Sequence, residues 1–300
     1  MAKKNEEVST VRRAKHGGIL TVIFAILSFL WIAPILIVFL NSFKRKAFIF
    51  THPFSLSCYS ITEGWDKFKA GITRAFCGWL NYSNGRRKTN LWECFGTSLF
   101  ITIGSVALII LCCSMCAWYI TRVHTKVTKT IYVLCLFSMI VPFQMVMFTL
   151  SKFANILHLS NPLGIIIVYL GFGAGLAVFM FTGFVKGISL EIEEAAMIDG
   201  CSPLQTFFKV VFPILKPTTV TVAILEAMWV WNDYLLPYLV LSSKYRTIPI
   251  AVQYLKQSHG QIDWGAMMAV LVLAILPIII FYIACQKYII EGVLAGAVKG

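Results

Sequence analysis

Six stretches of about 20 mainly apolar residues dominate the sequence. A helix of about 20 residues, rising about 1.5 Å per residue, crosses a hydrocarbon core about 30 Å thick. With 58% hydrophobic residues and a mean hydropathy of +0.79, the chain is far more apolar than a soluble domain. We therefore expect six membrane-spanning segments: 19–40, 97–120, 127–150, 163–183, 218–241 and 264–288.

The apolar stretches are continuous, which favours helices over the strands of a barrel. Barrel strands alternate between apolar and polar residues, whereas a helix satisfies its own backbone hydrogen bonds in lipid. The expected fold class is an all-α membrane protein with six transmembrane helices. Prolines within or near the spans predict kinks at Pro34, Pro142, Pro237 and Pro277.

The distribution of lysine and arginine indicates how the helices are oriented. Basic residues close to the spans favour the cytoplasmic side, which places the basic leader and the 122–129 turn inside. Residues 41–93 carry nine basic residues and would lie outside, but long loops count little in this rule. Both termini are then cytoplasmic. The chain divides into a cytoplasmic leader (1–16), a first transmembrane helix (17–43) and an extracytoplasmic loop or small subdomain (44–93). A transmembrane core (94–288) follows, with a cytoplasmic loop at 187–213, and a cytoplasmic tail (289–300) ends the sequence.

Several classes of function find no support in the sequence. The net charge of +13 is spread over both sides, so the lipid bilayer is an expected partner and nucleic acid is not. Five histidines are scattered without an assembled catalytic group, and no GxxxxGK[ST] phosphate loop occurs. We expect the chain to have no catalytic residues and not to bind ATP through such a loop.

The nine cysteines do not indicate a metal site either. Cys113 and Cys116 form a CxxC pair within an apolar span, without a second pair or a histidine cluster. We expect these thiols to pack as small apolar groups, and no metal to be bound. Cys58 and Cys77 share the outer loop and could form a disulfide in an oxidising compartment, which the sequence does not decide.

A polar island at residues 187–213 interrupts the apolar pattern. Ser189 can cap a helix whose first turns carry acidic residues, and Gly200 can end that helix in a left-handed conformation. Ser202 then begins a second helix with a capping-box spacing, and Pro213 and Pro217 are expected to limit it before the fifth span. The island predicts a helix–turn–helix, and it lacks the apolar stripe of a helix that lies in lipid. A protein cleft suits it better.

This island resembles the signature of the permease subunits of binding-protein-dependent ABC importers. That signature reads Glu-Ala-Ala, three residues, Gly, nine residues and Ile-x-Leu-Pro, and residues 194–196, Gly200 and 210–213 match it. Val210 and Phe212 depart conservatively from Ile and Leu. The resemblance implies a type I importer permease fold in which a coupling helix binds a cytoplasmic ATPase through Glu193, Glu194, Ala195, Ala196, Asp199, Gly200 and Pro213.

Other segments look like the second permease of maltose-type sugar importers: Pro-Phe-Gln-Met (142–145), Trp-Asn-Asp-Tyr (231–234), Asp-Trp-Gly (263–265) and the terminal residues 291–300. The likeness covers nearly the whole chain and is weakest in residues 41–93. It implies that the tail reaches the ATPase dimer interface, through Ala295, Gly296, Ala297, Val298, Lys299 and Gly300.

The resemblance implies a complete importer around this chain. Its partners would be a homologous second permease, two cytoplasmic ATPase subunits and an extracellular solute-binding protein, in a bacterial cytoplasmic membrane. ATP and Mg²⁺ would bind to the partner ATPases, and this chain would hold no cofactor. The expected cargo is a carbohydrate, in particular an oligosaccharide, and the binding protein would select which sugar enters.

Polar groups within the apolar spans are candidates for a translocation path, because ionisable groups in a membrane are costly. The candidates are Gln144, Glu226, Trp229, Asn232 and Asp233. Amides and carboxylates beside aromatic faces suit a sugar, but for Glu226 we favour a buried interhelical hydrogen bond. Two alternatives remain open at this point: an ABC permease for a non-sugar solute, and a proton-coupled secondary transporter that uses Glu226 and Asp233.

Overall fold

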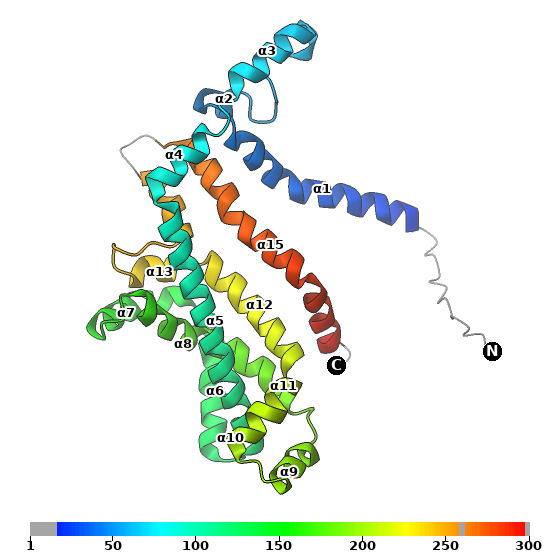
Figure 1. Ribbon diagram of the computed structural model, residues 1–300, viewed down its shortest axis with the longest axis vertical. Coiled ribbons are helices and arrows are strands. Elements are labelled where there is room, and N and C mark those ends of the chain that lie inside the picture. Colours follow the sequence, from blue (N-terminus) through cyan, green and yellow to red (C-terminus); the bar gives the residue numbers. More distant parts are fainter. Residues whose placement is uncertain (1–16, 258–261, 298–300) are drawn as a thin grey trace, which may run out of the picture.

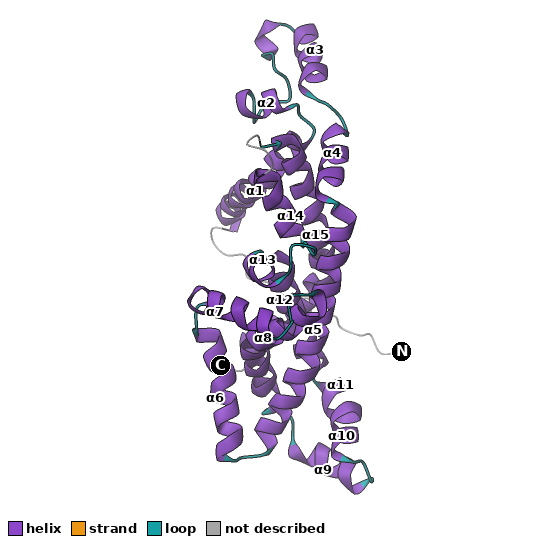
Figure 2. Ribbon diagram, turned by 90° about the vertical axis from the view of Figure 1, so that its left-hand side faces the viewer, coloured by secondary structure: helices purple, strands orange, loops and turns teal. Residues whose placement is uncertain are grey.

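Helices form the described part of the chain, residues 17–257 and 262–297 of a computed structural model, with no strand among these residues (Figure 1, Figure 2). Four helices within this part are long and apolar enough to cross a membrane unbroken. They are α1 (Gly17–Ser42), α5 (Leu91–Arg122), α8 (Pro162–Val185) and α15 (Trp264–Ala297). Two bent helix pairs raise the number of candidate crossings to six, which confirms the expected all-α membrane fold.

The third predicted span, 127–150, is broken into two helices. α6 (Lys126–Ile140) and α7 (Phe143–Ile156) meet at an angle of 108°. Pro142 has no N–H and disfavours a helical conformation of the residue before it, so Val141 is extended, with a ψ of 117°. The kink expected at Pro142 is therefore a full break, and α7 turns away from α6 (Figure 2).

The fifth predicted span, 218–241, is shorter than expected. α12 (Lys216–Asn232) ends at Asp233, whose backbone is extended with a ψ of 126°. The Asp233 carboxylate accepts hydrogen bonds from the N–H groups of Leu235 and Leu236, at 3.0 and 3.4 Å. It thereby starts a separate short helix, α13 (Leu235–Val240). Hydropathy does not register this break, because the residues on both sides are apolar.

α5 and α8 form the centre of the bundle and contact each other more extensively than any other helix pair of the described chain. α6 packs against α8, and α12 packs against α5, α8 and α15. Ile109, Ala177, Phe181 and Val222 are fully buried where these helices meet. Burial of apolar side chains on three or four facing helices fixes their relative positions.

A helical extension occupies one end of the molecule. It consists of α2 (Lys46–Thr51), the 3-10 turn η1 (Ile61–Glu63), α3 (Trp65–Ala75) and α4 (Leu80–Thr89). Figure 1 shows it at the end opposite to the short helix α9 (Leu190–Ile198). A further helix, α14 (Ile248–Gln257), packs against α15, α5 and α4. Cys58 and Cys77 of the extension are free thiols.

A buried polar cluster joins this extension to α1. The Nζ atom of Lys44, fully buried, donates hydrogen bonds to the carbonyl oxygens of His52 and Pro53, at 2.8 and 3.2 Å. The amide of Asn81 donates to the carbonyl oxygens of Ser42 and Lys44, both at 2.8 Å. Burial lowers the pKa of Lys44, and these carbonyl groups offset the cost of removing its ammonium from water.

α1 stands apart from the rest of the bundle. None of the residues in its most apolar 18-residue window is buried, although the helix does contact α15. Figure 1 shows that it meets the other helices near its C-terminal end and diverges from them towards its N-terminal end. The polar cluster at Lys44 and Asn81 therefore sets the direction in which α1 leaves the extension.

Candidate functional site

The island predicted from the sequence is a helical hairpin at the end of the molecule opposite to the extension (Figure 1). Its first arm is α9, which Ser189 caps by accepting a hydrogen bond from the Glu191 N–H at 3.3 Å. Gly200 follows with a φ of +87°, and the N–H groups of Gly200 and Cys201 close the helix end on the carbonyl oxygens of Met197 and Ala196. This confirms the predicted cap and glycine turn.

The second arm begins and ends as predicted. Ser202 and Gln205 form a capping box at the start of α10 (Pro203–Thr206). The arm then continues through a π-helical turn, η2 (Phe207–Val211), and α11 (Phe212–Ile214), and bends by 76° before α12. The expectation that Pro213 and Pro217 limit this helix before the fifth span agrees with the structure: the arm ends at Ile214, one residue after Pro213, and Pro217 lies in the first turn of α12. The wider π turn, closed by the Phe212 N–H on the Phe207 carbonyl oxygen, accommodates Pro213, which has no N–H.

α9 has two different faces. Glu193 and Ala196 are buried against the rest of the chain, with 1% and 8% of their surface exposed. Glu194, Ala195 and Met197 face outwards, and Ile198 is 85% exposed. The exposed set also contains Asp199, Gly200 and Pro213. The seven residues that the sequence grouped as an ATPase contact therefore divide into two inward-facing and five outward-facing residues.

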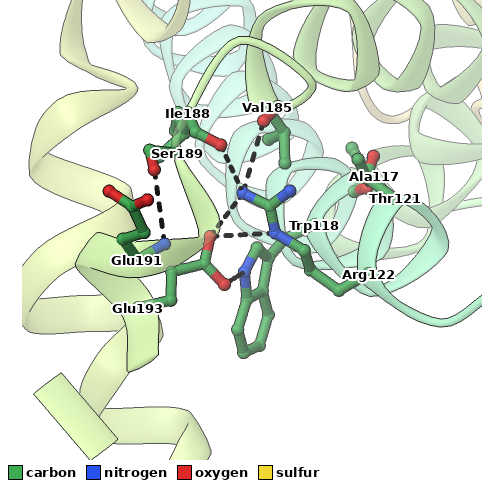
Figure 3. A network of polar contacts seen from close by, with 9 residues as sticks. All are labelled: Ala117, Trp118, Thr121, Arg122, Val185, Ile188, Ser189, Glu191 and Glu193. Carbon is green, nitrogen blue, oxygen red and sulfur yellow. Dashed lines mark hydrogen bonds and ion pairs between the residues drawn. The ribbon is translucent and has the colours of Figure 1, made fainter. Parts of the chain in front are cut away.

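An ion pair holds the inner face of α9 to the end of α5 (Figure 3). The Glu193 carboxylate accepts hydrogen bonds from Arg122 Nη2 at 2.7 Å and Nε at 3.0 Å, and from Trp118 Nε1 at 3.0 Å. Arg122 Nη2 also donates to the carbonyl oxygen of Ile188 at 3.0 Å. A buried carboxylate is stable when it is paired and its lone pairs are satisfied, as they are here.

The same part of α5 also holds the second arm. The rings of Trp118 and Phe207 lie with their centroids 5.4 Å apart. Phe207, Val211 and Leu215 are fully buried in the core that α5 and α8 build. Both arms of the hairpin are thus fixed to one turn of α5, through a charged contact on one side and an apolar contact on the other. Force applied to the outer face of α9 would reach α5 directly.

Sequence reasoning did not identify Trp118 and Arg122 as site residues. Arg122 served there only as a cytoplasmic charge, and Trp118 lay within an apolar span. One signal was available: a Trp and an Arg four residues apart share a helix face, at the end of that helix that carries a basic residue. Their partner, 71 residues beyond Arg122, could not be found by spacing.

Of the candidate path residues, Glu226 is the most buried, with 2% of its surface exposed. The Glu226 carboxylate, on α12, lies beside Gly173 of α8. The Oε2 atom of Glu226 has no hydrogen-bond partner among the described residues. A methyl group added to Gly173 would lie 2.9 Å from this Oε2 atom and 2.6 Å from Ile109 Cδ1. Gly173 therefore provides the space that Glu226 occupies.

Asp233 has a structural role that the sequence did not predict. One of its oxygens caps α13, and the other accepts a hydrogen bond from the Tyr169 hydroxyl at 3.1 Å. Tyr169 is fully buried and its ring meets that of Trp229 edge to face, at a centroid distance of 5.4 Å. Asp233 and Trp229 thus help to join α8 to the end of α12.

Asn232 lies in a pocket of about 290 Å³ beside the broken end of α12. The pocket brings the aromatic rings of Trp231 and Tyr234 together with the amides of Asn232 and Gln253. Gln144 is exposed near the start of α7 and does not line this pocket. Gln253 was missed by sequence reasoning, because it lies on α14, a helix too short and polar to be predicted as a span.

The predicted tail contact falls at the end of α15. The helix continues to Ala297, beyond the predicted end of the sixth span, so Ala295, Gly296 and Ala297 belong to its last turn. Val298, Lys299 and Gly300 lie outside the described residues. In the described residues, no three His, Cys, Asp or Glu side chains are grouped so that they could hold a metal ion.

Comparisons with known proteins agree with the hairpin and the helical fold. Residues 109–294 match the family described as "Binding-protein-dependent transport system inner membrane component". The chain is 38% identical to the "Probable starch degradation products transport system permease protein AmyC" of Thermoanaerobacterium thermosulfurigenes, over 94% of this chain and 96% of that protein. It is 32% identical to the "Multiple sugar-binding transport system permease protein MsmG" of Streptococcus mutans, over 94% of each.

A third relative is the "Melibiose/raffinose/stachyose import permease protein MelC" of Bacillus subtilis, 30% identical over 96% of this chain and 99% of that protein. The fold also matches a chain of a bacterial ABC transporter involved in the import of the acidic polysaccharide alginate. The TM-score is 0.70 at 21% sequence identity, covering 96% of this chain and 99% of that one. With its signature hairpin and its apolar helices, the chain is a multi-pass membrane protein that belongs to the inner-membrane components of binding-protein-dependent transport systems, the permease subunits of ABC importers.

Proposed function

We propose that this chain is a permease subunit through which a carbohydrate, in particular an oligosaccharide, enters the cell. The observation that carries the proposal is the construction of α9. Its inner face is fixed to α5 by Arg122 and Trp118, and its outer face, with Glu194 and Ile198, is open to a partner. A rigid helix with one attached face and one free face can transmit the movement of a partner into the bundle.

The partner at the outer face is a cytoplasmic ATPase. The apolar side chains of Met197 and Ile198 beside the carboxylate of Glu194 suit a protein groove with a basic rim better than water or lipid. Two ATPase subunits, a homologous second permease and an extracellular solute-binding protein complete the importer. The last turn of α15, with Ala295, Gly296 and Ala297, reaches towards the ATPases, which bind the ATP and Mg²⁺.

Two kinds of evidence favour a carbohydrate as the cargo. Relatives named for starch degradation products, multiple sugars and melibiose, raffinose and stachyose align with nearly the whole chain. The pocket beside Asn232 combines the rings of Trp231 and Tyr234 with two amides, which suit the apolar faces and the hydroxyl groups of a sugar. The proton-coupled alternative, with Glu226 and Asp233 as carriers, conflicts with the family and with the capping role of Asp233.

Transport by the reconstituted complex tests this function. The chain is co-expressed with its partners, purified and placed in proteoliposomes with ATP inside and the binding protein outside. Uptake of a radiolabelled oligosaccharide that requires internal ATP and survives a protonophore is the expected result. Uptake that follows the proton gradient, or uptake of amino acids or ions in place of sugars, would overturn the proposal.

The orientation has its own test. Cys201 lies in the hairpin and Cys58 in the outer extension, and both are free and partly exposed thiols. A membrane-impermeant maleimide added outside sealed cells should modify Cys58, and Cys201 should react only in inverted vesicles, with the modified peptides identified by mass spectrometry. Labelling of Cys201 from outside would place the hairpin on the wrong side for an ATPase.

A further inference from the structure

A second pocket lies at the same end of the bundle as the hairpin, between the C-terminal ends of α5 and α8 and the first turn of α6. Its volume is about 480 Å³. Lys126 and Lys129 of α6, Lys186 after α8 and His124 between α5 and α6 contribute to its lining, and none of the residues that line it is acidic. Three ammonium groups without a carboxylate among them favour an anion.

A residue with a buried hydroxyl also lines this pocket. Thr182 has 2% of its surface exposed, and its Oγ1 atom is buried without a hydrogen-bond partner in the described part of the chain. The neighbouring hydroxyls are already engaged: Thr121 donates to the Ala117 carbonyl oxygen at 2.7 Å, and Thr128 donates to the Val123 carbonyl oxygen at 2.6 Å. The Thr182 hydroxyl can therefore donate to a ligand oxygen without breaking a bond.

The pocket also receives the positive end of a helix. Thr125 caps the 15-residue helix α6, and its Oγ1 atom accepts a hydrogen bond from the Thr128 N–H at 3.2 Å. The partial positive charge at the start of this helix adds to the charge of the lysines. Lysines, a hydroxyl donor and a helix N-terminus together match the several acceptor oxygens of a phosphate group.

One wall of the pocket is apolar. Ile120 is buried, and Tyr132 presents a half-buried ring beside the lysine stems. A ligand with an anionic head and an apolar body could therefore use the whole pocket, with its head among the lysines and its body against this wall.

We propose that this pocket is a binding site for a phosphate-bearing anion. Two sources share this chemistry: the headgroup of an anionic phospholipid in the adjacent leaflet, and a soluble phosphate compound. The site adjoins the hairpin anchor, because Thr121 and Arg122 are consecutive residues of α5, one at the pocket and one at Glu193. An anion that ties α5, α6 and α8 together stiffens the base of the hairpin, a consequence that rests on the proposed coupling function.

Binding to the purified complex in detergent, followed by native mass spectrometry and calorimetry, tests the site. The probes are short-chain phosphatidylglycerol, short-chain phosphatidylcholine and inorganic phosphate. The variants Lys126→Gln, Lys129→Gln and Lys186→Gln remove one exposed charge each, and Thr182→Val removes the buried hydroxyl. Lys216→Gln is the matched control, because Lys216 is exposed at the start of α12 and does not line the pocket.

Phosphatidylglycerol should bind more tightly than phosphatidylcholine, and each pocket lysine removed should weaken its binding about fivefold. Thr182→Val should also weaken binding, and Lys216→Gln should leave it unchanged. Inorganic phosphate that binds with the same variant dependence and displaces phosphatidylglycerol would identify a soluble ligand, whereas lipid binding unaffected by phosphate would identify the headgroup. Both results support the site.

Equal binding of all probes, or equal effects of Lys216→Gln and the pocket variants, would overturn the proposal. The binding measurement requires no transport, so a negative binding result can be distinguished from a failure of the proposed transport function. If the complex imports sugar with ATP but shows no selective binding, only the anion site is contradicted. If the complex binds the anion selectively but imports no sugar, only the transport proposal is contradicted.

Discussion

Arg122 at the end of α5 and Glu193 in α9 form an ion pair with an N–O distance of 2.7 Å. The Glu193 side chain is 1% exposed and that of Arg122 is 19% exposed, so water screens the pair only weakly. Trp118 and the Ile188 carbonyl oxygen occupy the remaining hydrogen-bonding positions. The pair gives the hairpin a fixed orientation relative to α5, which lies at the centre of the bundle.

Arg122→Ala should uncouple ATP hydrolysis from uptake. It leaves the Glu193 carboxylate buried without a cation, which costs about 3–5 kcal/mol and is relieved if α9 leaves its position. The ratio of sugar imported to ATP hydrolysed in proteoliposomes should fall, while ATPase activity persists. Glu193→Gln should behave similarly, and Glu191→Gln on the exposed face is the matched control. An unchanged ratio in Arg122→Ala would show that the ion pair plays no part in coupling.

Gly200→Ala should weaken the hairpin through its backbone. Gly200 has a φ of +87°, and no atom lies within 4 Å of where a methyl group would be added, so crowding is not the cause. The left-handed conformation costs an alanine about 1–2 kcal/mol, and Gly200→Asn should cost less. The same transport ratio measures the effect. Gly183 on α8 also has no atom within 4 Å of an added methyl group, so Gly183→Ala should leave the transport ratio unchanged. Equal effects at both glycines would contradict the backbone explanation.

Gly173→Ala should disturb the contact between α8 and α12. The added methyl group would lie 2.6 Å from Ile109 Cδ1 and 2.9 Å from Glu226 Oε2, so these side chains must move, at a cost of about 1–3 kcal/mol. A lower thermal midpoint of the purified complex and slower uptake are expected. Gly171→Ala, two residues away with no atom within 4 Å, is the control. Equal midpoints for the two variants would mean that α8 and α12 are not closely packed.

Acid should weaken the link between α4 and α15. Asp263 accepts hydrogen bonds from Lys88 and from the Ala266 N–H. Burial raises the pKa of this carboxyl, but the Lys88 and Ala266 hydrogen bonds and the charges of Lys88 and Lys46 together lower it below its ordinary value. The stabilisation is therefore complete above the unfolded-state pKa of about 3.9 and is lost as the pH falls through the lower, folded-state value.

Asp263→Asn tests this contribution. Because Lys88 is 48% exposed, the pair should contribute only about 0.2–1 kcal/mol at neutral pH. The variant should melt at a slightly lower temperature than the native chain at pH 7, and the two should converge as the pH falls below the unfolded-state pKa of about 3.9. Asp66→Asn, an exposed acid of α3, is the control. A difference between variant and native chain that grows on acidification would reverse the sign argued here.

Hydropathy and capping rules predicted the helical membrane fold and the local structure of the hairpin, because both depend on neighbouring residues. The Ser189 cap, the Gly200 turn and the Ser202 capping box lie within a few residues of the groups they bind. Rules of this kind do not give the angle between one helix and the next. Pro142 predicted a kink within its span, but only the structure shows that the two halves meet at 108°.

The attachment of the hairpin could not be predicted, because it joins residues that are distant in sequence. Glu193 was grouped with its neighbours as part of an outer contact surface, whereas the structure places it inside, against Arg122 and Trp118. Asp233 was a candidate for the path, and it caps α13 and binds Tyr169 from another helix. Sequence patterns locate a polar residue in a span without indicating which helix it faces.

The isolated position of α1 has a consequence for how the protein is made. The ribosome synthesises α1 before Asn81 and α15, which hold its C-terminal end. Until those residues are made, α1 must rest in lipid without them, and its apolar surface allows this. The direction of α1 is therefore fixed only after α15 has been inserted.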